Sequence, residues 1–191
     1  MTYSELKSVL REDLARYKYQ SYGERIFWGY LVWLRLTHFL ASKCRRNKFF
    51  YPFYFILLII NRITSHFYQI QIPVWTKIEG GLKFAHYSGI VVAGSVTIGK
   101  NCTLHQNVTI GNGFSHNNSG HPVIGDNVLI FPGAVIVGNI SVGNHVMVTA
   151  NAVVTKDVPD NSIVGGIPAR VIGKYDDDTL TDFAKDLYEV H

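Results

Sequence analysis

The chain has 191 residues, is 47% hydrophobic and carries a formal net charge of +4. This composition provides enough apolar material for a sizeable core and excludes a disordered segment. Residues 1–66 hold eleven Lys and Arg against four Asp and Glu, whereas the remainder holds seven against ten. The larger part of the chain therefore lacks the basic surface of a nucleic-acid-binding protein, and we expect no nucleic-acid partner.

Residues 1–70 are expected to form a helical segment. Ser4 followed by Glu5 is typical of the start of a short helix, and two longer apolar helices are expected at 25–41 and 49–66. Residues 1–22 are polar and charged, so we expect no cleavable signal sequence. Two cysteines cannot build a framework of disulfides. These features together indicate a cytoplasmic protein.

The second long apolar helix follows a basic cluster, which consists of Lys43, Arg45, Arg46 and Lys48. Residues 49–60 are uncharged, but these twelve positions fall short of the ~20 apolar residues that span a bilayer. Two interpretations stay open. The helices pack on each other, on the neighbouring repeats or on another subunit, or they associate peripherally with the inner face of an anionic membrane.

An aliphatic residue returns at every sixth position between residues 92 and 154, with one interruption. The ten positions are Val92, Ile98, Leu104, Ile110, Ile124, Ile130, Ile136, Val142, Val148 and Val154. A small or β-branched residue follows four positions later in most units, and Gly, Asn or Asp fill much of the space between. Six-residue repeats of this kind predict a triangular parallel β-helix with three hexads in each coil. Weaker units at Ile72, Ile78 and Phe84 extend it to residues 71–173, which leaves 174–191 as an acidic tail.

The interruption lies between Ile110 and Ile124, where fourteen positions replace six, so an eight-residue loop is expected within 111–123. Loops that leave a regular repeat often carry recognition and chemistry. This loop contains His116 and His121, and the coil before it contains His86. Histidine can accept a proton near neutral pH, so a hydroxyl nucleophile can be activated here without a covalent enzyme intermediate.

The hexads, the Gly-His-Pro sequence at 120–122 and the ending at 148–172 together resemble the hexapeptide-repeat acyltransferases. The resemblance covers about residues 70–173 and is to the serine acetyltransferase branch and its relatives in surface-polysaccharide gene clusters. It implies a left-handed coil, which departs from the usual right-handed crossover. It also implies a homotrimer with acetyl-CoA, as co-substrate, in the groove between neighbouring β-helices. No metal is expected.

The same resemblance assigns roles to two histidines. His86, in His86-Tyr-Ser-Gly-Ile-Val-Val92, would deprotonate the acceptor hydroxyl. His121, in His121-Pro-Val-Ile124, would position that hydroxyl or stabilise the tetrahedral oxyanion. For His105 and His145 we favour a surface or packing role.

The resemblance also implies where the coenzyme is bound. Contacts to its pantetheine and nucleotide fall on Pro132, Gly133, Ala150, Thr155, Lys156 and Arg170. Small residues let a ligand approach the backbone, and the two cations are charge-assisted donors for a phosphate. The small residues equally suit the tight corners of a β-helix.

Three departures from the family pattern bear on the acceptor. Serine acetyltransferases carry Asp fifteen residues before the catalytic histidine, Asp immediately before it and Arg before the loop histidine, where this chain has Gln71, Ala85 and Gly120. A charged amino-acid acceptor would leave its groups unpaired, which costs several kcal/mol. Five residues suit sugar stacking and hydrogen bonding, namely Tyr87, Phe114, His116, Asn117 and Asn118. The loop residues equally suit a solvated turn.

The resulting prediction is an acetyl-CoA-dependent O-acetyltransferase whose acceptor is a carbohydrate, either a capsular, exopolysaccharide or lipid-linked sugar. Two alternatives stay open. The first is a serine O-acetyltransferase of cysteine biosynthesis, which requires other residues to replace the missing charges. The second is a non-catalytic or metal-binding β-helix, in which the histidines hold zinc or nothing.

Overall fold

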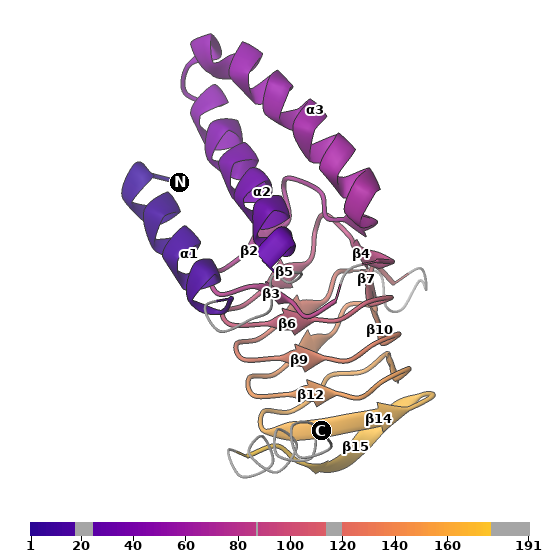
Figure 1. The fold of residues 1–191 in the computed structure, drawn as a ribbon. Coiled ribbons are helices and arrows are strands. Elements are labelled where there is room, and N and C mark those ends of the chain that lie inside the picture. Colours follow the sequence, from indigo (N-terminus) through magenta and orange to yellow (C-terminus); the bar gives the residue numbers. More distant parts are fainter. Residues whose placement is uncertain (18–24, 87, 114–119, 177–191) are drawn as a thin grey trace.

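The computed structural model describes residues 1–17, 25–86, 88–113 and 120–176. Three helices stand on one end of a triangular stack of short strands (Figure 1). The helices are α1 (Tyr3–Ala15), α2 (Arg25–Cys44) and α3 (Tyr51–Tyr68), and a single 3-10 turn, η1 (Lys48–Phe50), precedes α3.

The helix boundaries follow from local chemistry. The first helix is capped by Thr2 rather than by Ser4 as predicted. Thr2 Oγ1 accepts from the Glu5 amide at 3.2 Å, and the Glu5 carboxylate accepts from the Thr2 amide at 2.8 Å. This reciprocal pair satisfies two amides that the first helical turn leaves free. Helix α3 begins with Pro52 in its first turn and ends at Gln69, whose φ of 53° stops the helix.

The strands are two to six residues long and follow one another at hexad spacing. They are β1 (Ile70–Gln71), β2 (Lys77–Ile78), β3 (Lys83–Phe84), β4 (Ile90–Val92), β5 (Thr97–Ile98), β6 (Thr103–Leu104), β7 (Thr109–Gly111), β8 (Val123–Ile124), β9 (Leu129–Ile130), β10 (Val135–Val137), β11 (Ser141–Val142), β12 (Met147–Val148), β13 (Val153–Val154), β14 (Ser162–Gly166) and β15 (Ala169–Lys174).

Up to β13, every third strand lies in the same sheet, so the chain winds through three sheets in turn. The first sheet has the order β1-β4-β7-β10-β13, and the second has β11-β8-β5-β2. The third has β15-β14-β12-β9-β6-β3. All pairs are parallel except the hairpin of β14 and β15, which closes the end remote from the helices (Figure 1). This arrangement is the parallel β-helix predicted from the repeats.

The core runs along the axis of the β-helix. All ten predicted hexad positions, from Val92 to Val154, are at most 2% exposed. Most of the corners are made by residues in the left-handed region, for example Asn101, Asn107 and Asn127, with φ between 56° and 59°. Asparagine tolerates this conformation better than other residues with a side chain.

The interrupting loop leaves the β-helix without disturbing its register. Val91 of β4 pairs with Thr109 of β7, and Thr109 pairs with Val135 of β10. The second step is longer by the eight residues that the loop adds, yet the strands remain neighbours. The chain therefore leaves the coil after β7 and returns to it at β8, at the corner between the first and second sheets.

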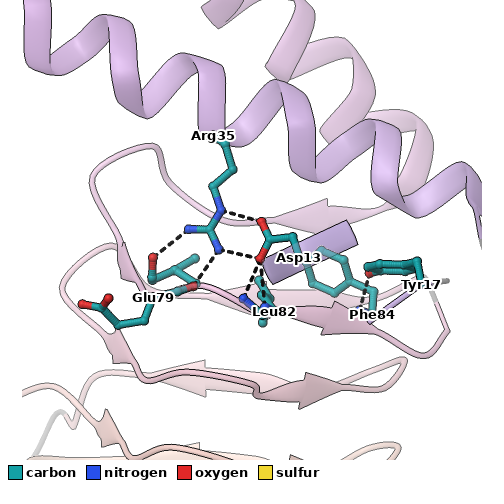
Figure 2. A network of polar contacts seen from close by, with 8 residues as sticks. Asp13, Tyr17, Arg35, Glu79, Leu82 and Phe84 are labelled. Carbon is teal, nitrogen blue, oxygen red and sulfur yellow. Dashed lines mark hydrogen bonds and ion pairs between the residues drawn. The ribbon is translucent and has the colours of Figure 1, made fainter. Parts of the chain in front are cut away.

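A buried ion pair joins the helices to the first coil (Figure 2). Arg35 of α2 donates from Nε and Nη2 to the Asp13 carboxylate of α1, at 2.9 and 3.2 Å. Its Nη1 and Nη2 also donate to the carbonyl oxygens of Ile78 and Glu79, at 2.6 and 2.7 Å. Asp13 and Arg35 are 0% and 2% exposed, so each charge depends on these partners.

Asp13 of α1 and Tyr17, just after this helix, also form hydrogen bonds with the backbone of the first coil. Asp13 Oδ1 accepts from the amides of Gly81 and Leu82 at 2.9 and 3.0 Å. The Phe84 amide donates to the Tyr17 hydroxyl at 2.7 Å (Figure 2). The helical segment and the β-helix therefore share one polar junction. The division at residues 70 and 173 into separate units stays a prediction.

One face of α3 is apolar and exposed. Its exposed apolar side chains are Tyr51, Phe53, Phe55, Ile56, Ile59, Ile63 and Phe67. Helix α2 contacts α3 along its other side. Among the described helices, none is long and apolar enough to cross a membrane.

Candidate active site

A cavity of about 510 Å³ opens on the outer surface of the third sheet, beside the corner that follows β3. It is lined by Arg16, Lys83, Ala85, His86, Asn101, Thr103, His105, Gln106, Asn127, Val128, Leu129, Phe131, Pro132 and Tyr175. The cavity wall is thus formed by the residue after α1, by three successive coils of the β-helix and by Tyr175 near the end of the described residues. We call it the His86 cavity.

His86 follows β3 at the corner between the third and first sheets, and its side chain is exposed. Its ring lies 5.9 Å from the ring of His105, centroid to centroid. The strand register explains this proximity, because the Ala85 amide donates to the carbonyl oxygen of Leu104 at 3.0 Å. His86 therefore faces an open cavity that an acceptor hydroxyl can enter.

His105 is fixed in one tautomer by its surroundings. Its ring stacks on Phe131 with centroids 5.0 Å apart and planes at 7°. Its Nδ1 lies 2.9 Å from the carbonyl oxygen of Ile130. A carbonyl oxygen only accepts, so Nδ1 carries the hydrogen and Nε2 of the neutral ring is an acceptor. Burial lowers the pKa of His105, and the bond to Ile130 opposes this effect only in part.

We had favoured a surface or packing role for His105, yet it lines the same cavity as His86. The signal that finds it is its position one coil after Ala85, the residue next to His86. Residues that are one coil apart share a face of the β-helix, so their side chains become neighbours.

His121 lies elsewhere on the same chain. It is exposed at the corner between the first and second sheets, and its Nδ1 is 2.8 Å from Asn112 Oδ1. The described residues that line the His86 cavity do not include His121. One copy of the chain therefore does not bring the two predicted catalytic histidines into one cavity.

The six predicted coenzyme contacts spread along the β-helix. Pro132 lines the His86 cavity, and Gly133 follows it with a φ of 73°. A Cβ at Gly133 would collide with Asn151 Oδ1, so the corner itself requires glycine there. The other four lie on the last coil and the closing hairpin. Ala150, Lys156 and Arg170 are exposed and Thr155 is half-buried.

Five residues were predicted to bind substrate, and all of them lie outside the described residues. They are Tyr87, Phe114, His116, Asn117 and Asn118.

The three positions that lack the family's charges lie in different places. Ala85 lines the His86 cavity. Gln71 lines a separate cavity of about 420 Å³ beside α3, together with Arg62 and His66. Gly120 pairs with Gly113 at the base of the loop. Only the first of these positions is thus directly beside His86 in one copy.

The cysteines are not placed for covalent catalysis. Cys102 is buried in the core, where burial raises the pKa of its thiol to about 11. Its Sγ lies 3.2 Å from the carbonyl oxygen of Gly125. Cys44 is buried among the helices. In the described part of the chain, no group of three or more His, Cys, Asp or Glu side chains is arranged to hold a metal.

Comparison with known proteins shows which transferases the chain resembles. Residues 121–156 match the bacterial transferase hexapeptide family (six repeats). Over 141 residues, the chain is 38% identical to a serine acetyltransferase of Staphylococcus aureus, covering 74% of this chain and 63% of the relative. A serine acetyltransferase of Staphylococcus epidermidis is 36% identical over the same length, with the same coverage. The chain thus spans slightly less than two thirds of these relatives.

Solved structures of serine acetyltransferases also resemble the chain in fold. A serine acetyltransferase from Brucella abortus superposes with a TM-score of 0.75 at 29% identity, covering 91% of this chain and 71% of that one. The chain is thus similar to the serine acetyltransferases and carries repeats of the bacterial transferase hexapeptide family. The coenzyme A complex of the Brucella enzyme gives a TM-score of 0.74 at 29% identity, with 91% and 70% coverage. A soybean serine acetyltransferase complexed with serine also gives 0.74, at 28% identity with 88% and 70% coverage.

The comparisons confirm the predicted left-handed β-helix with an N-terminal helical segment. They contradict the predicted carbohydrate acceptor and role in polysaccharide biosynthesis, because these relatives are serine acetyltransferases. The prediction was wrong because it took the missing charges at three motif positions to mean an uncharged site. Arg16 and Lys83 bring cations to the His86 cavity from positions outside those motifs.

Proposed function

We propose that the protein is a serine O-acetyltransferase, which transfers an acetyl group from acetyl-CoA to the hydroxyl of L-serine, as in cysteine biosynthesis. The observation that carries the proposal is His86 at an open cavity whose wall also holds Pro132 and two cations. The resemblance to serine acetyltransferases supports it, including a relative with bound coenzyme A and one with bound serine.

The proposed reaction is a direct transfer. His86 accepts the proton of the serine hydroxyl as the oxygen attacks the carbonyl carbon of the acetyl thioester. The tetrahedral intermediate then expels the coenzyme A thiolate by breaking the C–S bond. The thiolate takes up a proton, which the His86 imidazolium can supply. Pro132 and the other coenzyme candidates on later coils would place the thioester along the β-helix.

We further propose that the active protein is a homotrimer. His86 and His121 occupy different corners of one β-helix. A neighbouring copy can present its loop corner to the His86 cavity, so both histidines would act at the boundary between two copies. This geometry also accounts for an exposed His121 that is held only by Asn112 within its own chain.

The test is serine-dependent release of coenzyme A from acetyl-CoA, followed with a thiol reagent. We expect saturable release with L-serine and O-acetylserine as the product, identified by mass spectrometry. D-serine and L-alanine serve as controls for stereochemistry and for the need of a hydroxyl. Release that requires a sugar and ignores L-serine would refute the proposal.

We also propose that the exposed face of α3 and the basic cluster hold the protein at an anionic membrane. Seven apolar side chains are exposed on this helix, and Arg45, Arg46 and Lys48 are exposed at its start. Each basic residue near such a surface adds about 1 kcal/mol of attraction. We expect cosedimentation with phosphatidylserine vesicles that weakens with salt and in the quadruple serine variant of the basic cluster. Absence of cosedimentation at low ionic strength would show that α3 serves only for packing between proteins.

A further inference from the structure

Arg16 joins the end of α1 to the wall of the His86 cavity. It is the residue after α1, and its side chain crosses to the second coil. Nη1 donates to the carbonyl oxygen of Asn101 at 3.2 Å, and Nη2 donates to Thr103 Oγ1 at 2.8 Å. These two contacts fix the guanidinium at the cavity while leaving other N–H groups available.

The guanidinium has a charge without a carboxylate partner in the described part of the chain. Both hydrogen-bond acceptors are neutral, and none of the described residues that line the cavity is acidic. Partial burial lowers the pKa of Arg16, which shows that the site disfavours an uncompensated cation. The contrast is Arg35, whose charge is balanced by Asp13. An anion that entered the cavity would restore the balance at Arg16.

Arg16 and the two histidines line the same cavity. Thr103, which Arg16 contacts, is two positions before His105, so the two residues are separated by roughly 7 Å along one side of the chain. His105 in turn lies beside His86. A molecule with a hydroxyl and a carboxylate can therefore meet a base and a guanidinium in one cavity.

We propose that Arg16 binds the carboxylate of the acceptor and orients its hydroxyl toward His86. The inference rests on the proposed function, because it names the group of serine that the cavity recognises. Arginine suits the task because its planar fork can offer two parallel N–H donors to one carboxylate. Lys83 lines the same cavity. A phosphate of the coenzyme carries the same kind of charge, so the experiment must separate the two sources.

The experiment compares the parent with Arg16→Gln in steady-state kinetics. We expect the KM for L-serine to rise about ten- to a hundredfold, because a charge-assisted pair is lost. The KM for acetyl-CoA and the reaction with L-serinamide, which lacks the carboxylate, should change little. Arg16→Lys should recover part of the affinity. The matched control is Arg11→Gln, which removes an exposed arginine from the same helix.

Three results would overturn the inference. Equal losses with L-serine and L-serinamide would assign Arg16 a purely structural role, which thermal unfolding of the variant would also reveal. A rise confined to the KM for acetyl-CoA would assign the guanidinium to a phosphate. Unchanged kinetics would exclude any contact with a ligand.

A binding measurement separates this inference from the proposed function. If the parent does not acetylate L-serine, the proposed function fails. Titration calorimetry with 3-hydroxypropionate then tests the anion site alone. Binding to the parent that is lost in Arg16→Gln would support the site, and absence of binding to the parent would overturn it.

Discussion

Replacing His86 by Ala is expected to lower turnover roughly 10²- to 10⁴-fold, the usual contribution of a positioned general base. The exposed ring faces the cavity and makes no described hydrogen bond, so its loss should leave the fold intact. The measurement is kcat for serine-dependent release of coenzyme A, together with the affinity for coenzyme A. His66→Ala is the matched control, since it removes an exposed histidine that lines the other cavity. Near-normal turnover in His86→Ala would refute the mechanism.

The same variant tests whether two copies share the site. His86→Ala and His121→Ala are each expected to be weakly active when produced alone. Co-expression should restore part of the activity, because some boundaries in a mixed trimer combine an intact His86 with an intact His121. No recovery, in mixed trimers verified by differently tagged chains, would place both histidines in one copy or remove His121 from the reaction.

Replacing Asp13 by Ala is expected to cost about 3–5 kcal/mol of unfolding free energy, as for other buried ion pairs that lose one partner. The change leaves the Arg35 guanidinium buried without its carboxylate and frees the amides of Gly81 and Leu82. Urea unfolding followed by circular dichroism measures the effect. Arg11→Ala, an exposed change on the same helix, should be nearly neutral.

The double variant Asp13→Ala, Arg35→Leu sharpens this test. Removing the second charge should recover part of the lost stability, because an unpaired buried guanidinium is then absent. Additive losses would show that the two residues act independently, contrary to the geometry in Figure 2. A loss below 1 kcal/mol in the single variant would show that water reaches the pair.

The β-helix could be predicted from the sequence because each hexad places the same types of residue at the same positions. A residue such as Ile98 or Ile130 points inward for the same reason as its neighbours six positions away, so the period alone identifies the core. The starts of the helices were less certain, because Thr2 and Ser4 are both good caps and only the partner contact distinguishes them.

The candidate site was predictable only in part. His86 belongs to a continuous motif, and its cavity position agrees with that motif. Arg16 enters the cavity because α1 docks on the first coil and the residue after this helix reaches the second coil. Such a contact between distant segments has no period and no spacing in the sequence. His105 was judged as an isolated histidine, although the coil length places it beside His86. The error about the acceptor came from treating recognition as a property of motifs rather than of a surface assembled from several segments.

The division of the coils among three sheets also limits how such a chain can change its length. Loss or gain of a single hexad between β3 and β9 would turn every later strand by one face of the triangle, and Pro132 would leave the side occupied by His86. Loss of a whole coil would preserve the face but shift the later strands along the axis. An outward loop at one corner alters neither, as the unbroken pairing of β7 with β10 demonstrates. Insertions at the corners therefore let a β-helix gain new surface while the residues of its catalytic face stay aligned from coil to coil.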